Sequence, residues 1–352
     1  MAKKLRISTD GGSTWLDLPG SEASLNLNGE QIDDTVLGQT FQSNEAGLIN
    51  WGASANGIFK GFAGYVAELM QQGSSTATTG ESMTQESGQI YAIDDSTREI
   101  WDRSQTVTVY DNAVDATANV AEIDYLFGRV TFDTGYSVTG PVTVDVNYYP
   151  LTTIARPNSY TLTMSADPKD ESDFAAVQAN SGYRVFSPGL RTVSLELGGI
   201  FDDNEDAKAV LVARSEIIVQ IDPAGDGSSI ARGFFKYGTV GQSGAVGAVE
   251  DETLNLYLVV PNETTNPQVE TPFNWRHTNT TLSPAIQALL TSWLSELNTY
   301  DFQYLPQGTP GQSPLDGAQG NFMVSDVSLS GGLDAMNVFQ AELQATGGLT
   351  EV

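Results

Sequence analysis

The sequence lacks cysteine entirely and contains a single histidine among its 352 residues. Without cysteine, disulfide bonds, thiolate chemistry and cysteine-based zinc sites are excluded. His277 would have to serve any Ser-His-Asp site alone, and no Gly-x-Ser-x-Gly motif accompanies it. We therefore expect a structural or surface role for His277, no metal or other cofactor, and no enzymatic activity.

Long apolar runs are also missing from the sequence. No segment approaches the length of a membrane span, so we expect no membrane insertion. The first residues, Met1-Ala2-Lys3-Lys4-Leu5, are not followed by the apolar stretch of a signal peptide. These features predict a chain that folds in a cytoplasm.

Basic residues are scarce: 16 Lys and Arg stand against 44 Asp and Glu, which gives a formal net charge of −28. Such a surface repels nucleic acid, because phosphate binding needs clustered Lys and Arg. Two interpretations stay open at this point. The charge reflects either adaptation to a salty habitat or a surface that must lie near DNA without adhering to it.

Short segments in which apolar and polar residues alternate dominate the chain, and this pattern is typical of strands with one buried face. These segments are 24–27, 90–93, 106–110, 123–132, 142–148, 159–164, 193–197 and 254–258. The Ser- and Thr-rich stretch 73–80 has no such pattern, and its composition predicts a flexible linker. The sequence therefore predicts a mainly β protein with a minority of helix.

Two segments predict helices. The first runs from about Asp202 to Arg214 and opens with acids, which suit a helix N-terminus. The second begins at Ser283, a good N-cap residue, with Pro284 at the first helical position. Its apolar residues recur on one helical face and are Ile286, Leu289, Leu290, Trp293, Leu294 and Leu297.

The sequence also contains two internal repeats. Residues 24–64 align without a gap on 159–199, so that Trp51 meets Phe186 and Ile58 meets Val193. An order of helix, strand and hairpin then occurs twice, over 202–258 and over 283–343. The central hairpin leads directly into the first helix unit. We therefore expect the last helix unit to complete the first hairpin, with the other domain nested between them.

Two motifs imitate functional sites. Ser8–Trp15 resembles one Asp-box of a sialidase-type propeller, but such a fold needs several copies, so a tight turn is expected. Asp202–Asp206 resembles the start of a calcium loop. Its sixth position is Ala207 where glycine is required, and its twelfth is Ala213 where glutamate is required.

The order of a long-looped hairpin, a helix, a strand and another hairpin resembles the tail tube fold of the major tail proteins of long-tailed, siphovirus-type viruses. The match is clearest over 202–260, with Ser215-Glu216-Ile217-Ile218-Val219 and Ala231-Arg232-Gly233-Phe234-Phe235. The segment 123–149, around Phe127-Gly128-Arg129-Val130, resembles the β-rich insertion that some of these proteins carry.

This resemblance implies two tail-tube-type β-sandwich or barrel domains, each with one flanking helix. The first domain would be split over 1–72 and 273–352, and the second would cover 157–262. A small β-sandwich insertion would occupy 88–152.

The resemblance further implies a structural virion protein of a bacteriophage-like tail and not an enzyme. A ring normally holds six tube domains, so a chain with two would form a homotrimer with pseudo-sixfold symmetry. Stacked rings would form the tail tube and the conduit for genome ejection. The implied partners are further copies of the chain, the tail terminator, the baseplate or tail tip proteins and the tape measure protein. Double-stranded DNA would pass without adhering.

Candidate functional residues follow from the same resemblance. Long loops near 28–50 and 163–185 would reach the adjacent ring, with Trp51 and Phe186 as candidate anchors. Core packing is the alternative for both aromatic residues. The candidate acids for the wall of the lumen are Glu68, Glu196, Asp326 and Glu342. Strand alternation leaves open which of them faces the lumen.

Two other classes of function stay open. Another virion component, such as a tail terminator, a baseplate hub or a capsid decoration protein, would share the strand-rich build. The Asp-box and the aromatic residues also suggest a glycan-binding protein or a glycosidase. The insertion at 88–150 could also bind a host surface glycan while the body of the protein builds the tube.

Overall fold

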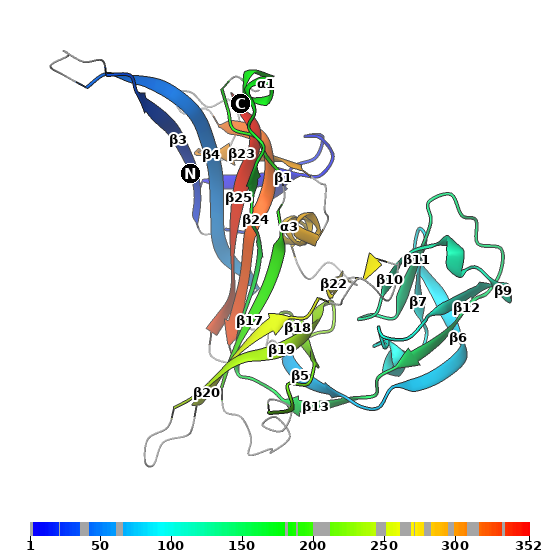
Figure 1. Ribbon diagram of the computed structural model, residues 1–352. Helices are drawn as coiled ribbons and strands as arrows, with labels where there is room; N and C mark the ends of the chain where they lie inside the picture. The colour runs from blue at the N-terminus through cyan, green and yellow to red at the C-terminus, as the bar shows by residue number, and fades with distance from the viewer. Residues whose placement is uncertain are drawn as a thin grey trace. The chain divides into compact units, whose positions relative to one another are not determined.

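A computed structural model describes most of the chain and confirms a mainly β architecture (Figure 1). The described residues are 3–20, 22–35, 42–60, 66–179, 182–187, 189–199, 212–243, 251–260, 269–270, 272–277, 283–294, 299–307, 317–332 and 335–352. Within them the chain forms two compact units. One comprises Met1–Ala63, Tyr160–Ser194 and Asn279–Val352, and the other Gly64–Ser159 and Leu195–Thr278.

The first unit is built on long antiparallel strands. Its elements are β1 (Lys4–Ser8), β2 (Leu16–Asp17), β3 (Glu22–Asp33), β4 (Asn44–Lys60), β14 (Ser159–Ala166), β15 (Lys169–Asp170), α1 (Phe174–Ala179), β16 (Phe186–Ser187), α3 (Pro284–Leu294), β23 (Tyr300–Leu305), β24 (Ala318–Gly332) and β25 (Ala335–Glu351). Strand β25 lies between β24 and β4, and β4 pairs with β3. The other edge of β24 adjoins β23 and then β14, and β14 adjoins β17 (Arg191–Gly199), which continues into the second unit.

Helix α3 forms as the sequence predicts, because Ser283 precedes it, Pro284 opens it and apolar residues line one face. The Gln287 N–H donates to the Ser283 carbonyl. Ile286, Leu289, Leu290 and Trp293 are buried, and the helix lies against β24. Burial of side chains of this size stabilises the fold by about 1.5–3 kcal/mol each. The helix thus covers the apolar face of the sheet.

The second unit contains a second antiparallel sheet and the insertion. Its elements are β5 (Val66–Gln72), β6 (Thr76–Ser87), β7 (Ile90–Ile93), η1 (Ser96–Arg98), β8 (Thr108–Asp111), β9 (Val114–Asp115), η2 (Thr117–Asn119), β10 (Val120–Asp124), β11 (Arg129–Phe132), β12 (Val142–Tyr148), β13 (Leu151–Ala155), β18 (Ile217–Asp222), β19 (Ser229–Ser243), β20 (Asp251–Leu258), β21 (Val269–Glu270) and β22 (Phe273–His277). In this antiparallel arrangement β13, β5, β18 and β19 follow one another, and β19 then pairs with both β22 and β20.

The insertion is a separate sheet with the strand order β21-β10-β11-β7-β6-β12-β8-β9. Its core contains Trp101, Tyr125, Val130 and Val144, which are fully buried. The same core includes Met70, Ile218, Ile230 and Phe234 from β5, β18 and β19. The insertion therefore packs directly on one face of the neighbouring sheet.

Two predictions of irregular structure were wrong. The expected linker 73–80 is largely strand, since β6 begins at Thr76 and pairs with β12 and β7. The expected loop 28–50 is a β-hairpin, because β3 continues to Asp33 and β4 starts at Asn44. Nearly all described residues of 26–33 and of β6 are exposed, so no alternation of apolar and polar residues marks these strands.

The expected loop 163–185 contains the end of β14, all of β15 and α1, so it is also partly regular. The gapless repeat fails within this segment. Ile58 is 46% exposed, whereas its aligned partner Val193 is 4% exposed. Ile58 therefore lies on an exposed face of its strand and Val193 on a buried face. A shift of one residue reverses every side chain of a strand, so the alignment requires a single-residue gap. The expected helix 202–214 and the calcium-like segment fall almost entirely outside the described residues.

Candidate functional site

One face of the sheet in the first unit is mainly polar across six strands, apart from the exposed cross-strand partners Ile58 and Val338, and we call it the polar face. Its partly or fully exposed residues are Glu22, Ser24 and Asn26 on β3, Ser54 and Asn56 on β4, Thr161, Thr163 and Ser165 on β14, Thr192 and Ser194 on β17, Asp326, Ser328 and Ser330 on β24, and Gln340 and Glu342 on β25. Cross-strand partners such as Ser24 and Ser54 meet directly, with 2.7 Å between their hydroxyl oxygens.

On the described strands of the polar face, the charged side chains are the carboxylates Glu22, Asp326 and Glu342. One described cation lies beside them, because Lys3 lines a hollow together with Glu22, Ser24, Ser54 and Asn56. Arg191 of β17 belongs to the opposite face, where its guanidinium lies 5.7 Å from the Trp293 ring centroid and donates to the Leu294 carbonyl. Around Asp326 and Glu342 the surface therefore offers phosphate groups no positive potential.

Two of the predicted lumen acids are directly opposite each other on this face. Asp326 of β24 is the cross-strand partner of Glu342 of β25. Partial burial, together with the neighbouring Glu342 carboxylate, raises the pKa of Asp326 above its ordinary value. Like charges in this arrangement destabilise a sheet. The fold therefore tolerates an electrostatic cost at this point of the polar face.

The structure places the other two predicted lumen acids differently. Glu196 is exposed between buried Leu195 and Leu197, on the same side of β17 as Thr192 and Ser194. Glu68 is an ion-pair partner of Arg156, with 2.8 Å between the charged groups. Its side chain alternates with buried Leu69 and shares a face of β5 with Met70, which packs against the insertion. Glu196 thus fits an exposed wall better than Glu68 does.

Most described arginines are engaged inside the chain. Arginine–carboxylate pairs are Arg6–Asp17, Arg98–Glu81, Arg98–Asp95, Arg103–Glu216, Arg129–Glu86, Arg156–Glu68, Arg184–Glu30, Arg184–Asp170, Arg232–Glu99 and Arg276–Glu99. These pairs neutralise the arginines that take part in them. The net negative charge of the chain therefore comes from carboxylates outside these pairs.

The two predicted anchors have different surroundings. Trp51 is 2% exposed, donates from its indole nitrogen to the Gly347 carbonyl at 2.8 Å, and lies 5.7 Å from the Phe302 ring centroid. This position favours the core-packing alternative for Trp51. Phe186 is only partly buried in β16, so it retains ring surface for a contact with another chain.

Arg184 connects the two long segments that the sequence predicts at the inter-ring contact. Its guanidinium pairs with Glu30 on β3 and with Asp170 on β15. Alongside these ion pairs, the Arg184 and Ile49 main chains are hydrogen bonded, and Ile49 also donates to Gly182. The β3–β4 hairpin and the segment between β14 and β17 therefore form one composite surface within the first unit.

His277 lies at the end of a hydrogen-bonded chain in the second unit. The Trp275 indole N–H donates to the Ser229 hydroxyl oxygen at 2.7 Å, and this hydroxyl is hydrogen bonded to Nδ1 of His277 at 2.9 Å. Burial lowers the pKa of His277 to about 4, so the ring is neutral at pH 7. Ser229 is 1% exposed and cannot meet a substrate, which agrees with the structural role expected for His277.

The Asp-box-like segment is a local turn. Asp10 accepts from the Thr14 N–H at 2.8 Å, the Gly12 N–H donates to the Ser8 hydroxyl, and Gly11 and Gly12 have positive φ angles. Among the described residues no group of three or more His, Asp and Glu side chains could hold a metal ion. No helix in the described part of the chain is long and apolar enough to cross a membrane.

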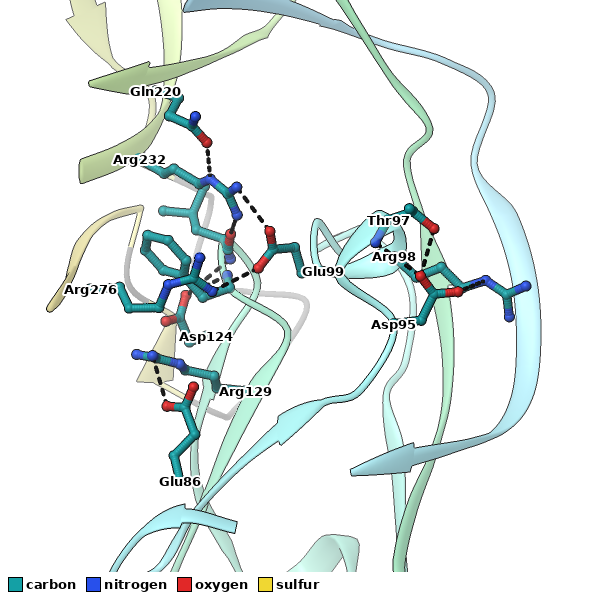
Figure 2. A network of polar contacts seen from close by, with 12 residues as sticks. Glu86, Asp95, Thr97, Arg98, Glu99, Asp124, Arg129, Gln220, Arg232 and Arg276 are labelled. Atoms are coloured by element: carbon teal, nitrogen blue, oxygen red, sulfur yellow. Dashed lines mark hydrogen bonds and ion pairs between the residues drawn. The ribbon is translucent and has the colours of Figure 1, made fainter. Parts of the chain in front are cut away.

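A charged cluster that sequence patterns did not predict lies between the insertion and strands β19 and β22, and we call it the arginine joint. It consists of Glu99, Phe127, Arg232 and Arg276. Glu99 accepts from both guanidiniums, each at 2.9 Å, as Figure 2 shows. Glu99 and Arg276 are 177 positions apart, so no local spacing could reveal the contact.

No protein-family model matches the sequence, and a search of curated proteins finds no match. Two solved structures contain chains with partial similarity. One is in the tail of an empty gene transfer agent particle with C6 symmetry, is 19% identical with a TM-score of 0.28, and matches 32% of this chain and 84% of its own. The other, in the virion of a native gene transfer agent particle, has the same identity and TM-score and matches 32% and 85%. Similarity of this extent assigns no function by itself.

Proposed function

We propose that the chain is a structural tail tube protein that forms homotrimeric rings with pseudo-sixfold symmetry, stacked into the conduit for a viral genome. The observation that carries this proposal is the polar face. It is a broad exposed sheet surface with paired carboxylates at Asp326 and Glu342, and its described strands place no basic side chain on it. A wall of this type suits the passage of double-stranded DNA without adhesion.

The strand pairing supports two equivalent building units in the chain. Strand β4 of the first hairpin pairs along β25 of the last hairpin, as a first domain split over 1–72 and 273–352 requires. In addition, β18-β19-β20 and β23-β24-β25 are both antiparallel arrangements in the same sequential order. The second domain would then be 157–262, with the insertion at 88–152.

The edge of the sheet in the first unit supports assembly with further copies. Among the described strands, β3 is paired on one edge only, through β4. A free edge of this length exposes unpaired main-chain groups, and closure into a ring of subunits removes such edges. We propose that another copy of the chain covers β3.

The proposed partners and location follow from the assembly. The rings would meet a tail terminator at one end and baseplate or tail tip proteins at the other, with a tape measure protein in the lumen before DNA. The protein would then reside in the virion tail. It would act without catalysis.

Electron microscopy of the purified chain, combined with native mass spectrometry, tests the proposal. We expect hollow tubes whose rings contain three copies and show six similar lobes. Single closed rings that never stack would favour a tail terminator, and a stable monomer under all assembly conditions would contradict the proposal. A glycan array provides the matching test for the glycan-binding alternative.

A further inference from the structure

The segment Val269–His277, which we call the crossover segment, contacts two different sheets of the second unit. Its first part, β21, pairs in parallel with β10 of the insertion, so that Val269 lies beside Glu122. Its second part, β22, pairs antiparallel with β19, from Phe273 beside Gly233 to His277 beside Ser229. Only about two residues separate the two strands, so a short stretch of chain is held on both sides.

We propose that the insertion is a brace that fixes the crossover segment, in which the chain enters the last part of the proposed first tube domain after leaving the second. This inference goes beyond the proposed function and uses its domain division only to identify what is connected. Main-chain pairing of β21 with β10 gives the first contact. Side chains of β22 give the second, through Asn274 and Arg276.

The turn between β10 and β11 carries the groups that hold β22. Asp124 is buried, and one of its carboxylate oxygens accepts from the main-chain N–H groups of Leu126 and Phe127 at 3.0 and 3.2 Å. Its other oxygen accepts from the Asn274 side chain at 2.8 Å. A single carboxylate therefore both shapes the turn and binds the crossover segment.

The turn inserts Phe127 among three guanidinium groups. The Arg232 and Arg276 guanidinium carbons are each 4.8 Å from the ring centroid, and that of Arg129 is 5.4 Å away. Phe127 is 1% exposed, and cation–π attraction strengthens when the ring and cation are desolvated. Arg232 also donates to the Leu126 carbonyl at 3.0 Å.

Glu99 completes the arginine joint from the insertion side. Its two carboxylate oxygens separately bind Arg232 of β19 and Arg276 of β22, and Gln220 accepts from Arg232 (Figure 2). Glu99 is 9% exposed and Arg232 is 8% exposed. Removal of one partner leaves a buried charge without compensation, so the contact resists opening. Main-chain pairing and buried ion pairs thus join the insertion to the crossover segment. An insertion attached only through its chain ends would make neither kind of contact.

A disulfide trap on the isolated chain tests the main-chain contact. The chain has no cysteine, so the Glu122→Cys/Val269→Cys double variant contains only the designed pair. Neighbouring strands lie about 4.8 Å apart, within the range that a disulfide spans. We expect the cross-link to form rapidly under mild oxidation. The Val114→Cys/Val269→Cys control pairs β21 with β9 at the far end of the same sheet, and it should not cross-link.

Hydrogen exchange tests the side-chain contact. Arg276→Gln should raise exchange rates in β10, β11 and β22 by about tenfold or more, because β22 loses both its ion pair with Glu99 and its contact with Phe127, while Glu99 keeps Arg232. Arg156→Gln is the matched control, since that side chain is 72% exposed and lies outside the joint. Equal exchange in both variants, or no cross-link in the first test, would overturn the brace. If Arg276→Gln does not fold, the cross-link alone decides. Neither readout requires tube formation, so failure of the brace is distinct from failure of the proposed function.

Discussion

The only histidine of the chain is held neutral by its neighbours. Nδ1 of His277 is hydrogen bonded to the Ser229 hydroxyl, and its ring stacks on Trp275 with 5.8 Å between the ring centroids. Protonation of the ring would place a charge in a partly buried site. The local structure therefore favours the neutral ring.

We predict that His277 titrates near pH 4 in the folded chain, well below the ordinary value of 6.5. Between these values the unfolded chain binds more protons, so His277 contributes stability above pH 6.5 that is lost as the pH falls towards 4. A shift of this size corresponds to at most about 3 kcal/mol, and partial exposure of the ring reduces it. An NMR titration is unambiguous because there is one histidine. A pKa near 6.5 would refute the burial argument.

The two aromatic residues predicted as anchors should respond differently to truncation. Trp51→Ala should lower the free energy of unfolding by about 3–5 kcal/mol, because it empties a core site. Phe186→Ala should cost about 1–2 kcal/mol, since Phe186 is only partly buried, and should reduce tube formation if the ring is an anchor. Chemical denaturation of the isolated chain measures the first effect, with Trp51→Phe as a control. An unchanged free energy of unfolding in Trp51→Ala would contradict core packing and favour a role for Trp51 as an anchor between rings.

Among the elements, the turn between β10 and β11 depends on a close approach that only glycine permits. Gly128 has a φ of +57°, and an added Cβ would lie 2.6 Å from a methyl carbon of Ile93 and 3.0 Å from Cα of Glu99. This glycine follows Phe127 and contacts the residue that bridges the arginine joint. The turn, the insertion core and the joint are therefore coupled at one position.

Gly128→Ala should destabilise the second unit more than Gly88→Ala does. Both glycines have positive φ, but nothing lies within 4 Å of an added Cβ at Gly88. Gly88→Ala isolates the backbone cost of about 1–2 kcal/mol. Gly128→Ala should add about 1–3 kcal/mol of steric strain. Thermal unfolding of the two variants measures the difference. Equal melting temperatures would show that the β10–β11 turn accommodates the added methyl group without steric strain.

Elements with one buried face could be predicted from the sequence, and elements defined by distant partners could not. The alternation in Val142–Tyr148 gives β12 its observed bounds, and the apolar face beginning at Ile286 gives α3. By contrast, the outer half of β3 is exposed on both faces, so its strand conformation depends on pairing with β4. Asp326 and Glu342 were predicted as exposed acids, but their register as direct neighbours needed the pairing of β24 with β25.

At the scale of the whole molecule, salt adaptation and a DNA-repelling wall are the two explanations of the acidic charge. They predict different positions for the carboxylates. Salt adaptation needs only a large net charge. A non-adhesive wall needs carboxylates, and an absence of cations, on one particular surface. The described strands of the polar face carry only carboxylates as charged groups, with Lys3 beside Glu22, while the described arginines of the second unit are largely paired within it. Charge position, not total charge, therefore separates the explanations.

We predict that the Asp326→Lys/Glu342→Lys double variant binds double-stranded DNA, whereas the natural chain does not. The substitutions put two cations side by side on the polar face, and binding should weaken steeply as salt rises, because counterions are released. Co-sedimentation of assembled protein with a DNA fragment measures the effect. The Asp94→Lys/Asp133→Lys variant changes the net charge equally at exposed positions of the insertion, and it should leave the lumen and the DNA passage unchanged. In particles, the first variant should slow genome ejection. If both variants slow ejection to the same degree, the net charge and not the polar face controls passage, and the lumen assignment of Asp326 and Glu342 fails.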